Sequence, residues 1–313
     1  MDISVIICTY NRAESLRRTL QTCCDLVIPS GVTWELLVVD NNSSDQTKSV
    51  CQEFAANLPL RYIFEPQAGK SFALNRAIQE AKGDLLFFTD DDVDLPAEWL
   101  TVGVATASIH PNASFIGGRV IPRWETPPPA WMEKYSATWL SAVAVHQEKG
   151  ATERFLSKDE AFFGANVIFR RKVFTDGVAF HTAIGPQPGS EVRGEDTELM
   201  QRLMIAGHMA LYTPSLVVYH RNPSYRASES YLWNWFKGQG IKEARLAPVG
   251  TVPGIAYWGV PRYLWKQALI TLPLLVVARC FCSFEHWLPL EIRTARICGM
   301  IGEYRRQART EKR

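Results

Sequence analysis

The chain begins with apolar runs that alternate with segments of helical periodicity, and this alternation restricts the folds that it can adopt. The runs ISVIICT, WELLVVD, RYIF and LLFFT occupy residues 3–9, 34–40, 61–64 and 85–89. Runs as apolar as these are typical of strands that are buried on both faces, and the helices between them form right-handed crossovers. We therefore predict an α/β fold in which helices flank a mostly parallel sheet.

Further elements are predicted between and beyond these strands. Asn11 and Glu14 have capping-box spacing at the start of a first helix. A second helix is expected to begin near Ser43, and further helices are expected at 70–83 and 194–208. Additional strands are predicted at 115–121, 164–170 and 216–220. The proline-rich stretch 122–132 suits a loop or lid rather than a helix.

Polar residues follow three of the predicted strands. TYNR (9–12) follows the first, DNNSSD (40–45) the second, and three aspartates (90–92) the fourth. In open α/β sheets, ligands bind beyond the carboxyl ends of the strands. We therefore expect the three polar clusters to meet at one edge of the sheet and to form a binding site there.

The aspartate triplet predicts a metal site. Adjacent carboxylates repel one another and resist burial unless a cation lies among them. Side chains alternate along an extended chain, so Asp90 and Asp92 point to the same side and Asp91 to the other. A phosphate-bound Mg²⁺ or Mn²⁺ needs only one or two protein carboxylates, because phosphate oxygens and water complete its shell. The triplet therefore fits a D-x-D arrangement.

The triplet has two other interpretations, an acidic turn before a helix and a calcium-binding loop. An acidic turn before a helix is common, and Pro96 with Glu98 resembles a first helical turn. A calcium-binding loop starting at Asp90 would need glycine and glutamate where the chain has Leu95 and Thr101, so this interpretation fails.

Several motifs together resemble those of the family 2 glycosyltransferases, which have the GT-A fold and are mostly bacterial. The motifs, in order, are ISVIICTYNR, ELLVVDNNSSD, AGKSFALNRA, FFTDDDV, GANVIFRR, GEDTEL and VYH, and they span about residues 1–220. The resemblance implies a GT-A, Rossmann-like catalytic domain over 1–220. It also implies a nucleotide-sugar donor, most often a UDP-sugar.

The resemblance assigns roles to residues at the expected sheet edge. Those that would bind the donor are Thr9, Tyr10, Asn11, Arg12, Asp40, Asn42, Lys70, Asn75, Asp90 and Asp91. Asp92 would be the main ligand of Mn²⁺ or Mg²⁺, with Asp90 beside it and His220 as a further ligand. A helix-capping role for Asn11, an ordinary exposed position for Lys70 and a structural role for His220 remain open alternatives.

Glu195 and Asp196 start a predicted helix, where acidic residues are favoured for structural reasons alone. In the family this pair supplies the catalytic base, which corresponds to Asp196, while Glu195 positions the acceptor. Gly164, Ala165 and Asn166 correspond to a segment under the donor sugar. With base and metal on opposite faces of the sugar, the resemblance implies inversion of the anomeric centre by a single displacement.

The last third of the chain differs in charge from the rest. Residues 1–220 carry 19 basic and 26 acidic side chains, whereas 221–313 carry 15 basic and 6 acidic ones. The apolar run at 268–278 is too short to span a bilayer, so we predict a C-terminal helical extension over 221–313. Its tryptophans and basic residues favour peripheral contact with an anionic membrane over binding to nucleic acid, with packing onto the core or a partner as the alternative.

The predicted compartment and activity follow from these features. Seven cysteines without a CxxC motif indicate buried, reduced thiols, and Met1 leads almost directly into a strand, so we expect no secretory signal. We expect a cytoplasmic enzyme at the inner face of the inner membrane that transfers sugar to a saccharide or lipid-linked saccharide. The alternatives are a sugar-phosphate nucleotidyltransferase and a non-catalytic nucleotide-sugar-binding or scaffold protein.

Overall fold

The structure is a computed structural model and describes residues 2–134, 143, 145–175, 177–190, 192–247 and 256–310. Within these residues the chain divides into two compact units. Unit 1 comprises Met1–Thr182 and Glu195–Ser224, and unit 2 comprises Ala183–Gly194 and Tyr225–Arg313. The boundary predicted at residue 220 lies inside a strand of unit 1, because that strand continues to Asn222.

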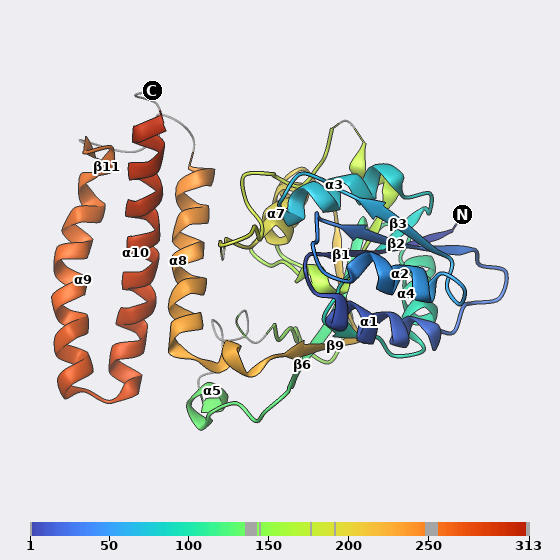
Figure 1. The fold of residues 1–313 in the computed structure, drawn as a ribbon, viewed down its shortest axis with the longest axis horizontal. Coiled ribbons are helices and arrows are strands. Elements are labelled where there is room, and N and C mark those ends of the chain that lie inside the picture. The colour runs from blue at the N-terminus through green and yellow to red at the C-terminus, as the bar shows by residue number, and fades with distance from the viewer. Residues whose placement is uncertain are drawn as a thin grey trace. The chain divides into compact units, whose positions relative to one another are not determined.

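Unit 1 is built on a mixed sheet with the strand order β3-β2-β1-β4-β8-β6-β9-β5, and β7 also pairs with β9 (Figure 1). Strands β1 to β4 are parallel, with Cys8 of β1 level with Val39 of β2 and Asp90 of β4. Strand β8 lies antiparallel to β4 and β6, whereas β6 and β9 are parallel to each other. The strands are β1 (Ile3–Thr9), β2 (Trp34–Asp40), β3 (Leu60–Phe64), β4 (Leu85–Asp90), β5 (Val93–Asp94), β6 (Phe115–Trp124), β7 (Arg154–Phe155), β8 (Val167–Arg170) and β9 (Ala210–Asn222).

Helices cover both faces of this sheet because its strands are apolar on both sides. Alternate residues of β1 enter two separate cores: Val5 packs in one and Ile6 in the other. The first core receives residues from α1 (Ala13–Cys24), α2 (Thr47–Phe54) and α4 (Trp99–Ile109). The second core receives residues from α3 (Lys70–Glu80) and α7 (Glu195–Ile205). The prediction of an α/β fold with a mostly parallel, flanked sheet is confirmed.

Several local predictions differ from the structure. Helix α1 begins after Arg12 and has no side-chain cap, so the predicted capping box is wrong; the carboxylate of Asp45 accepts the hydrogen bond from Ala13 N instead. The proline-rich stretch is not wholly a loop, since β6 continues to Trp124 and a short helix, α5 (Ala130–Lys134), follows. The strand predicted at 164–170 begins with a 3₁₀ turn, η1 (Gly164–Asn166).

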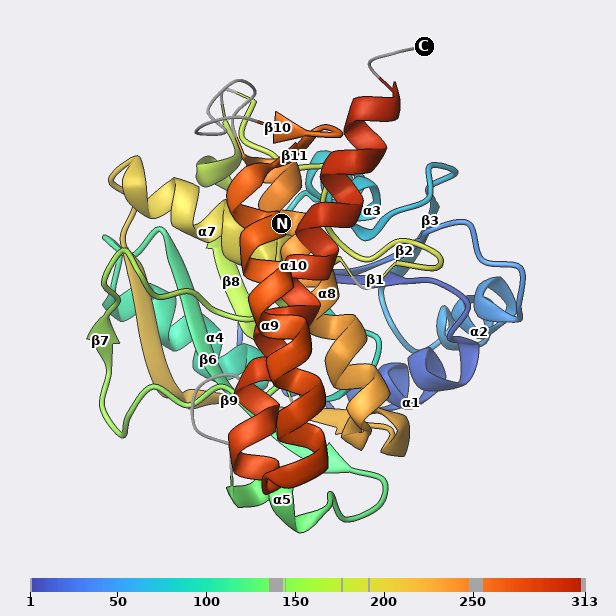
Figure 2. The same ribbon diagram turned by 90° about the vertical axis from the view of Figure 1, so that its left-hand side faces the viewer.

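Unit 2 consists mainly of three helices, α8 (Glu229–Leu246), α9 (Arg262–Phe281) and α10 (Phe284–Thr310); α8 and α10 run in the same direction, and α9 runs antiparallel to them (Figure 2). Helices α8 and α10 approach closely at Gly240 and Gly299, where a Cβ atom would collide with the backbone of the other helix. A short hairpin of β10 (Ala256–Tyr257) and β11 (Val260–Pro261) precedes α9. The C-terminal helical extension is thereby confirmed.

Helix α9 is longer than the apolar run 268–278 that the sequence shows in unit 2. The run lies within a helix of 20 residues that contains Pro273, and by length and composition alone this helix is long enough to span. The flanking polar residues continue the same helix, which a count of consecutive apolar residues does not detect.

The side chain of Asn166 links several elements of unit 1 through hydrogen bonds. Its Oδ1 accepts a hydrogen bond from Trp99 Nε1 at 2.9 Å, and its Nδ2 donates to the backbone carbonyls of Arg119 and Leu216 at 2.9 Å each. The side chain is fully buried and joins η1 to α4, β6 and β9.

We expect Asn166→Leu to lower the free energy of unfolding of unit 1 by about 2–4 kcal/mol, because it leaves three buried polar groups without their partner. Urea unfolding followed by circular dichroism measures the change. Replacement of the exposed Asn112 by alanine is the control and should change stability by less than about 0.5 kcal/mol. Equal stability of the two variants would contradict the role given to Asn166.

Candidate active site

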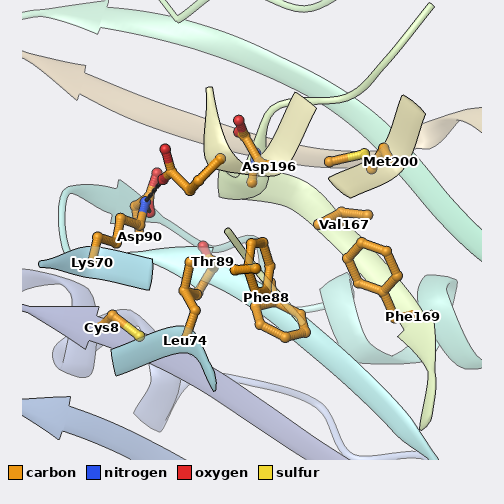
Figure 3. Close-up of a pocket in the computed structure, with 13 residues that line it drawn as sticks. Cys8, Lys70, Leu74, Phe88, Thr89, Asp90, Val167, Phe169, Asp196 and Met200 are labelled. Atoms are coloured by element: carbon orange, nitrogen blue, oxygen red, sulfur yellow. Dashed lines mark hydrogen bonds and ion pairs between the residues drawn. The ribbon is translucent and has the colours of Figure 1, made fainter. Parts of the chain in front are cut away.

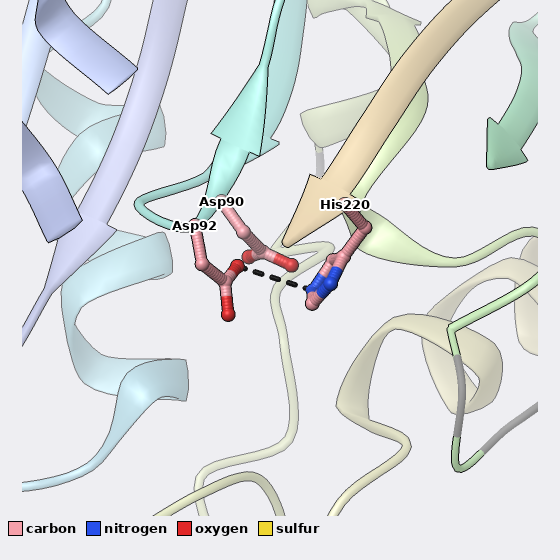
Figure 4. A group of neighbouring side chains, drawn as sticks. All are labelled: Asp90, Asp92 and His220. Carbon is pink, nitrogen blue, oxygen red and sulfur yellow. Dashed lines mark ion pairs between the residues drawn. The ribbon is translucent and has the colours of Figure 1, made fainter. Parts of the chain in front are cut away.

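The acidic turn lies where β4 ends and β5 pairs with β9. Asp90 is the last residue of β4, and Val93 of β5 lies opposite His220 of β9. This pairing brings His220 to the aspartates, so that Asp90, Asp92 and His220 each offer a ligand atom within 4.8 Å of the others (Figure 4). Asp92 and His220 are both buried, and Asp92 Oδ1 lies 3.1 Å from His220 Nε2. The sequence had suggested these three residues as the metal ligands.

The donor chemistry of this cluster fits a divalent cation. Two carboxylates and an imidazole suit Mn²⁺, and carboxylates with water suit Mg²⁺. The Nδ1 atom of His220 is buried and has no hydrogen-bond partner within the described part of the chain. The ring nitrogen that this structure places beside the aspartates is Nε2.

The third aspartate points away from the cluster and toward β1. Asp91 Oδ2 accepts a hydrogen bond from Thr9 Oγ1 at 2.7 Å, and its Oδ1 lies 2.7 Å from Arg12 Nη1. The other nitrogen of the Arg12 fork reaches Asp92 Oδ2 at 2.8 Å. Burial raises the pKa of Asp91, and the charge of Arg12 opposes this rise. Thr9 and Arg12, predicted to contact the donor, hold the acidic turn in this structure.

The expected base-binding residues lie at the ends of β1 and β2. Asp40 is buried and accepts hydrogen bonds from Tyr62 Oη at 2.7 Å and from Ser43 N at 2.9 Å. The side chain of Tyr10 is 38% exposed and is therefore accessible to a ring that stacks on it. Asn11 and Asn42 both have positive φ, of 49° and 67°, which turns the chain sharply after each strand.

Asn41 is a residue that the sequence interpretation missed. Its side chain is buried, accepts a hydrogen bond from Gly69 N at 2.7 Å and donates to the carbonyl of Gln67 at 2.6 Å. These bonds hold the turn at Gly69, whose φ of 134° favours glycine, immediately before Lys70 starts α3. Asn42 was chosen from the same DNNSSD motif, in which nothing distinguishes the buried asparagine from the exposed one.

Lys70 lies between the metal cluster and the predicted catalytic pair (Figure 3). Its Nζ is 2.6 Å from Asp90 Oδ1 and 3.8 Å from Glu195 Oε1. Burial disfavours the charged amine, but the carboxylates of Asp90 and Glu195 outweigh this effect and raise the pKa of Lys70. Lys70 is thus a permanent positive charge in the pocket rather than an ordinary exposed lysine.

The acidic pair at the start of α7 completes the pocket. Asp196 Oδ2 accepts a hydrogen bond from Gly164 N at 2.6 Å, and its Oδ1 accepts one from Thr197 N at 2.7 Å. Glu195 is buried, and its burial together with the neighbouring charge of Asp196 raises its pKa. Asp90, Lys70, Glu195 and Asp196 line one pocket, whose floor is formed by apolar side chains such as Phe88 and Met200.

Asn75, which was predicted to bind the donor, forms hydrogen bonds with the backbone of Phe180. Its amide donates to the carbonyl of Phe180 at 2.9 Å and accepts from Phe180 N at 2.8 Å. It thereby fixes the segment that carries Phe180, which lines the same pocket. Asn75 therefore contributes to the pocket by holding Phe180 in place.

Arg221 is a second residue that the sequence interpretation missed. It follows His220 and is 5% exposed, and its guanidinium pairs with Asp94. The same group donates to the carbonyl of Ser15 and to Thr19 Oγ1, both at 2.8 Å, and its backbone N–H donates to the carbonyl of Asp92 at 2.8 Å. The buried cation therefore fastens the acidic turn to α1 and β9.

Comparisons with known proteins agree with this architecture. The family model described as glycosyl transferase family 2 matches residues 4–177. Glycosyltransferase AglE of Haloferax volcanii is 28% identical over 221 residues, which are 70% of this chain and 66% of that protein. The succinoglycan biosynthesis protein ExoM of Rhizobium meliloti is 25% identical over 235 residues, which are 74% of this chain and 71% of ExoM.

Solved structures resemble the whole chain. A mannosyltransferase from Pyrobaculum calidifontis, in complex with GDP-Man and Mn²⁺, matches with a TM-score of 0.59 at 18% identity, over 99% of this chain and 88% of that one. S. aureus TarS 1–349 with UDP matches with a TM-score of 0.55 at 15% identity, over 99% and 92%. The fold is that of a GT-A glycosyltransferase. The chain belongs to glycosyl transferase family 2.

We expect Arg221→Met to lower the free energy of unfolding by about 2–3 kcal/mol, because it leaves acceptors of α1 and of the acidic turn without their buried cation, whereas Asp94 keeps its ion pair with Arg123. Urea unfolding measures this loss. Arg18→Met on α1 removes an exposed arginine and is the matched control, with an expected change within about 0.5 kcal/mol. A stable Arg221→Met variant would show that the turn does not depend on this residue.

Proposed function

We propose that this glycosyltransferase requires a divalent metal ion and transfers sugar from a nucleoside diphosphate donor with inversion of the anomeric centre. The observation that carries the proposal is the arrangement around one pocket. The cluster of Asp90, Asp92 and His220 adjoins it on one side, and Asp196 lines its wall. Inverting transfer needs a site for the leaving diphosphate and a base for the acceptor. The proposal assigns the first role to the metal cluster and the second to Asp196.

Asp196 is the proposed base. An acceptor hydroxyl would give its proton to this carboxylate while its oxygen forms a bond to the anomeric carbon, and the bond from that carbon to the diphosphate oxygen breaks. The backbone N–H groups of Gly164 and Thr197 fix the orientation of the carboxylate. Asp196 Oδ1 also accepts a hydrogen bond from Thr197 Oγ1 at 3.4 Å, so Oδ2 is the oxygen that retains a lone pair for the acceptor proton. Glu195, on the next position of the helix, would orient the acceptor.

The metal ligands in this proposal are Asp92, Asp90 and His220. When bound, the ion would neutralise negative charge on the diphosphate. The amine of Lys70, 2.6 Å from Asp90 Oδ1, would remain beside the phosphates as a second positive charge. Arg12 already neutralises one oxygen each of Asp91 and Asp92, which lets two buried carboxylates persist side by side.

The donor proposed is a UDP-sugar, which would stack its base on Tyr10 and donate a ring N–H to Asp40. Asn11 and Asn42 would form the rim of this pocket. Asp40 has lone pairs beyond those used by Tyr62 and Ser43, which is compatible with this contact. The complexes of structural neighbours include both UDP and GDP-Man, so a binding comparison of UDP and GDP by calorimetry tests the choice of base.

The acceptor proposed is a saccharide linked to a membrane lipid, and the enzyme would work at the cytoplasmic face of the inner membrane. Relatives include a glucosyl-dolichyl phosphate glucuronosyltransferase from Haloferax volcanii, 23% identical over 236 residues. Others are named as dolichol-phosphate and undecaprenyl-phosphate sugar transferases. Nucleoside diphosphate release with and without a membrane extract tests whether a membrane component is the acceptor.

Replacement of Asp196 by asparagine distinguishes an enzyme from a non-catalytic nucleotide-sugar-binding protein. We expect turnover to fall about 10²–10⁴-fold because the base is lost, while donor affinity stays within about threefold. Nucleoside diphosphate release and calorimetry measure the two quantities. Glu198→Gln, in the first turn of the same helix, is the control and should keep turnover. Unchanged turnover in Asp196→Asn would exclude this residue as the base.

Replacement of Asp92 by asparagine tests the metal site directly. We expect Mn²⁺ affinity, measured by electron paramagnetic resonance in the presence of UDP, to fall at least tenfold because a charged ligand is lost. Asp84→Asn removes a carboxylate whose side chain is 81% exposed, and it should leave Mn²⁺ binding unchanged. Sugar transfer should also stop when EDTA removes the metal. Transfer that persists with EDTA would refute metal dependence.

A further inference from the structure

Helix α9 has an apolar face that is exposed among the described residues of the chain. The exposed large apolar side chains on this helix between Leu269 and Phe281 are Leu269, Ile270, Leu272, Leu274, Val276, Val277 and Phe281, with exposures from 44% to 84%. At about 100° per residue they occupy roughly 200° of the helix circumference. The buried side of the helix is narrower and holds Leu264, Ala268, Thr271, Leu275 and Ala278.

Such a surface indicates a binding partner. Soluble proteins rarely expose contiguous apolar patches of this size unless the patch binds a protein or a membrane. The side chains here are adjacent along three turns of one helix, unlike the isolated exposed residues Ile109 and Ile205 of unit 1. The question is therefore which partner has a surface that matches this one.

The groups at the N-terminal end of α9 favour a negatively charged lipid surface. Arg262 and Lys266 are exposed, lie on the same side of the helix as the apolar face, and form no ion pair within the described part of the chain. The indole of Trp258 is 81% exposed, and Tyr257 and Tyr263 are exposed nearby in the sequence. Basic and aromatic side chains beside an apolar helical face are the pattern of helices that lie at the interface of anionic bilayers.

We propose that the outward face of α9, from Leu269 to Phe281, inserts into one leaflet of an anionic membrane, with Arg262 and Lys266 among the lipid headgroups. The proposal extends the proposed function, since it would hold the enzyme at a membrane that carries a lipid-linked acceptor. The argument for the surface itself uses only the residues of unit 2. A second copy of the chain is a poorer partner, because it would bring the same excess of basic groups to the interface.

The neighbouring helix shows that α9 lies in the interface and does not span the bilayer. Helices α9 and α10 are antiparallel and are joined by a short connection, so Leu272 and Arg293, which are equally far from it, lie at the same level (Figure 2). Arg293 is exposed, and Arg296 nearby pairs with Glu243 of α8 at 2.5 Å. A spanning α9 would carry these charged groups into the hydrocarbon, where each is costly.

Flotation of the purified full-length chain with lipid vesicles tests the proposal. We expect it to float with vesicles of phosphatidylcholine and phosphatidylglycerol and to float much less with phosphatidylcholine alone. The double variant Leu269→Glu/Val276→Glu should lower the partition coefficient at least tenfold, because it replaces buried apolar contacts with charges next to anionic lipid. Alkaline carbonate should release the bound protein, as expected for an interfacial helix.

The matched control is Ile109→Glu/Ile205→Glu, which removes two aliphatic side chains of 72% and 71% exposure and makes the same change in charge. It should float like the unchanged protein. Failure of the unchanged protein to bind anionic vesicles, equal loss in both variants, or resistance to carbonate would each overturn the proposal. A dimer in sedimentation that dissociates in the α9 variant, without vesicle binding, would identify a second copy as the partner.

The outcome is independent of the proposed function. Flotation is measured without donor or metal, and circular dichroism with urea unfolding shows separately that each variant is folded. A chain that binds vesicles but releases no nucleoside diphosphate would refute the enzymatic proposal and leave the membrane surface in place. A chain that transfers sugar but does not float would refute only the membrane surface.

Discussion

The site depends on the neutralisation of adjacent aspartates by cations that come from distant parts of the chain. Asp91 and Asp92 are both buried, and two buried carboxylates next to each other would be strongly destabilising alone. Arg12 from the end of β1 contacts both, and Arg221 from the end of β9 binds the backbone of the same turn. The turn therefore forms only where β1, β4 and β9 end together. The acidic cluster is a consequence of the tertiary fold.

This dependence explains which parts of the site were predictable. The apolar runs identified β1 to β4 because strands buried on both faces need such residues. The predicted separation of Asp91, which faces Thr9, from the cluster of Asp90 and Asp92 agrees with the structure, although Asp91 and Asp92 lie in a turn and not in an extended strand. Both predictions rest on short-range regularities of the backbone, which the sequence displays directly.

The residues that were missed act over long sequence distances. Arg221 contacts Ser15, and Asn41 accepts a hydrogen bond from Gly69 N and donates one to the carbonyl of Gln67. No local pattern distinguishes a buried arginine or asparagine from an exposed one, since the distinction arises from which strands become neighbours. The capping box failed for a related reason: no side chain caps α1 from its own N-cap position, and Ala13 N donates to Asp45, far along the chain. Tertiary contacts replaced a plausible local one.

The distribution of charge adds a constraint on how a nucleotide sugar would be held. Residues 1–220 carry 26 acidic and 19 basic side chains, so their overall charge would repel a diphosphate. Positive charge must therefore outweigh negative charge locally at the pocket. Lys70 supplies part of the positive charge, but its amine is already paired with the carboxylates of Asp90 and Glu195. A cation held by Asp90, Asp92 and His220 would supply the remainder, so a donor would bind well only together with its metal ion.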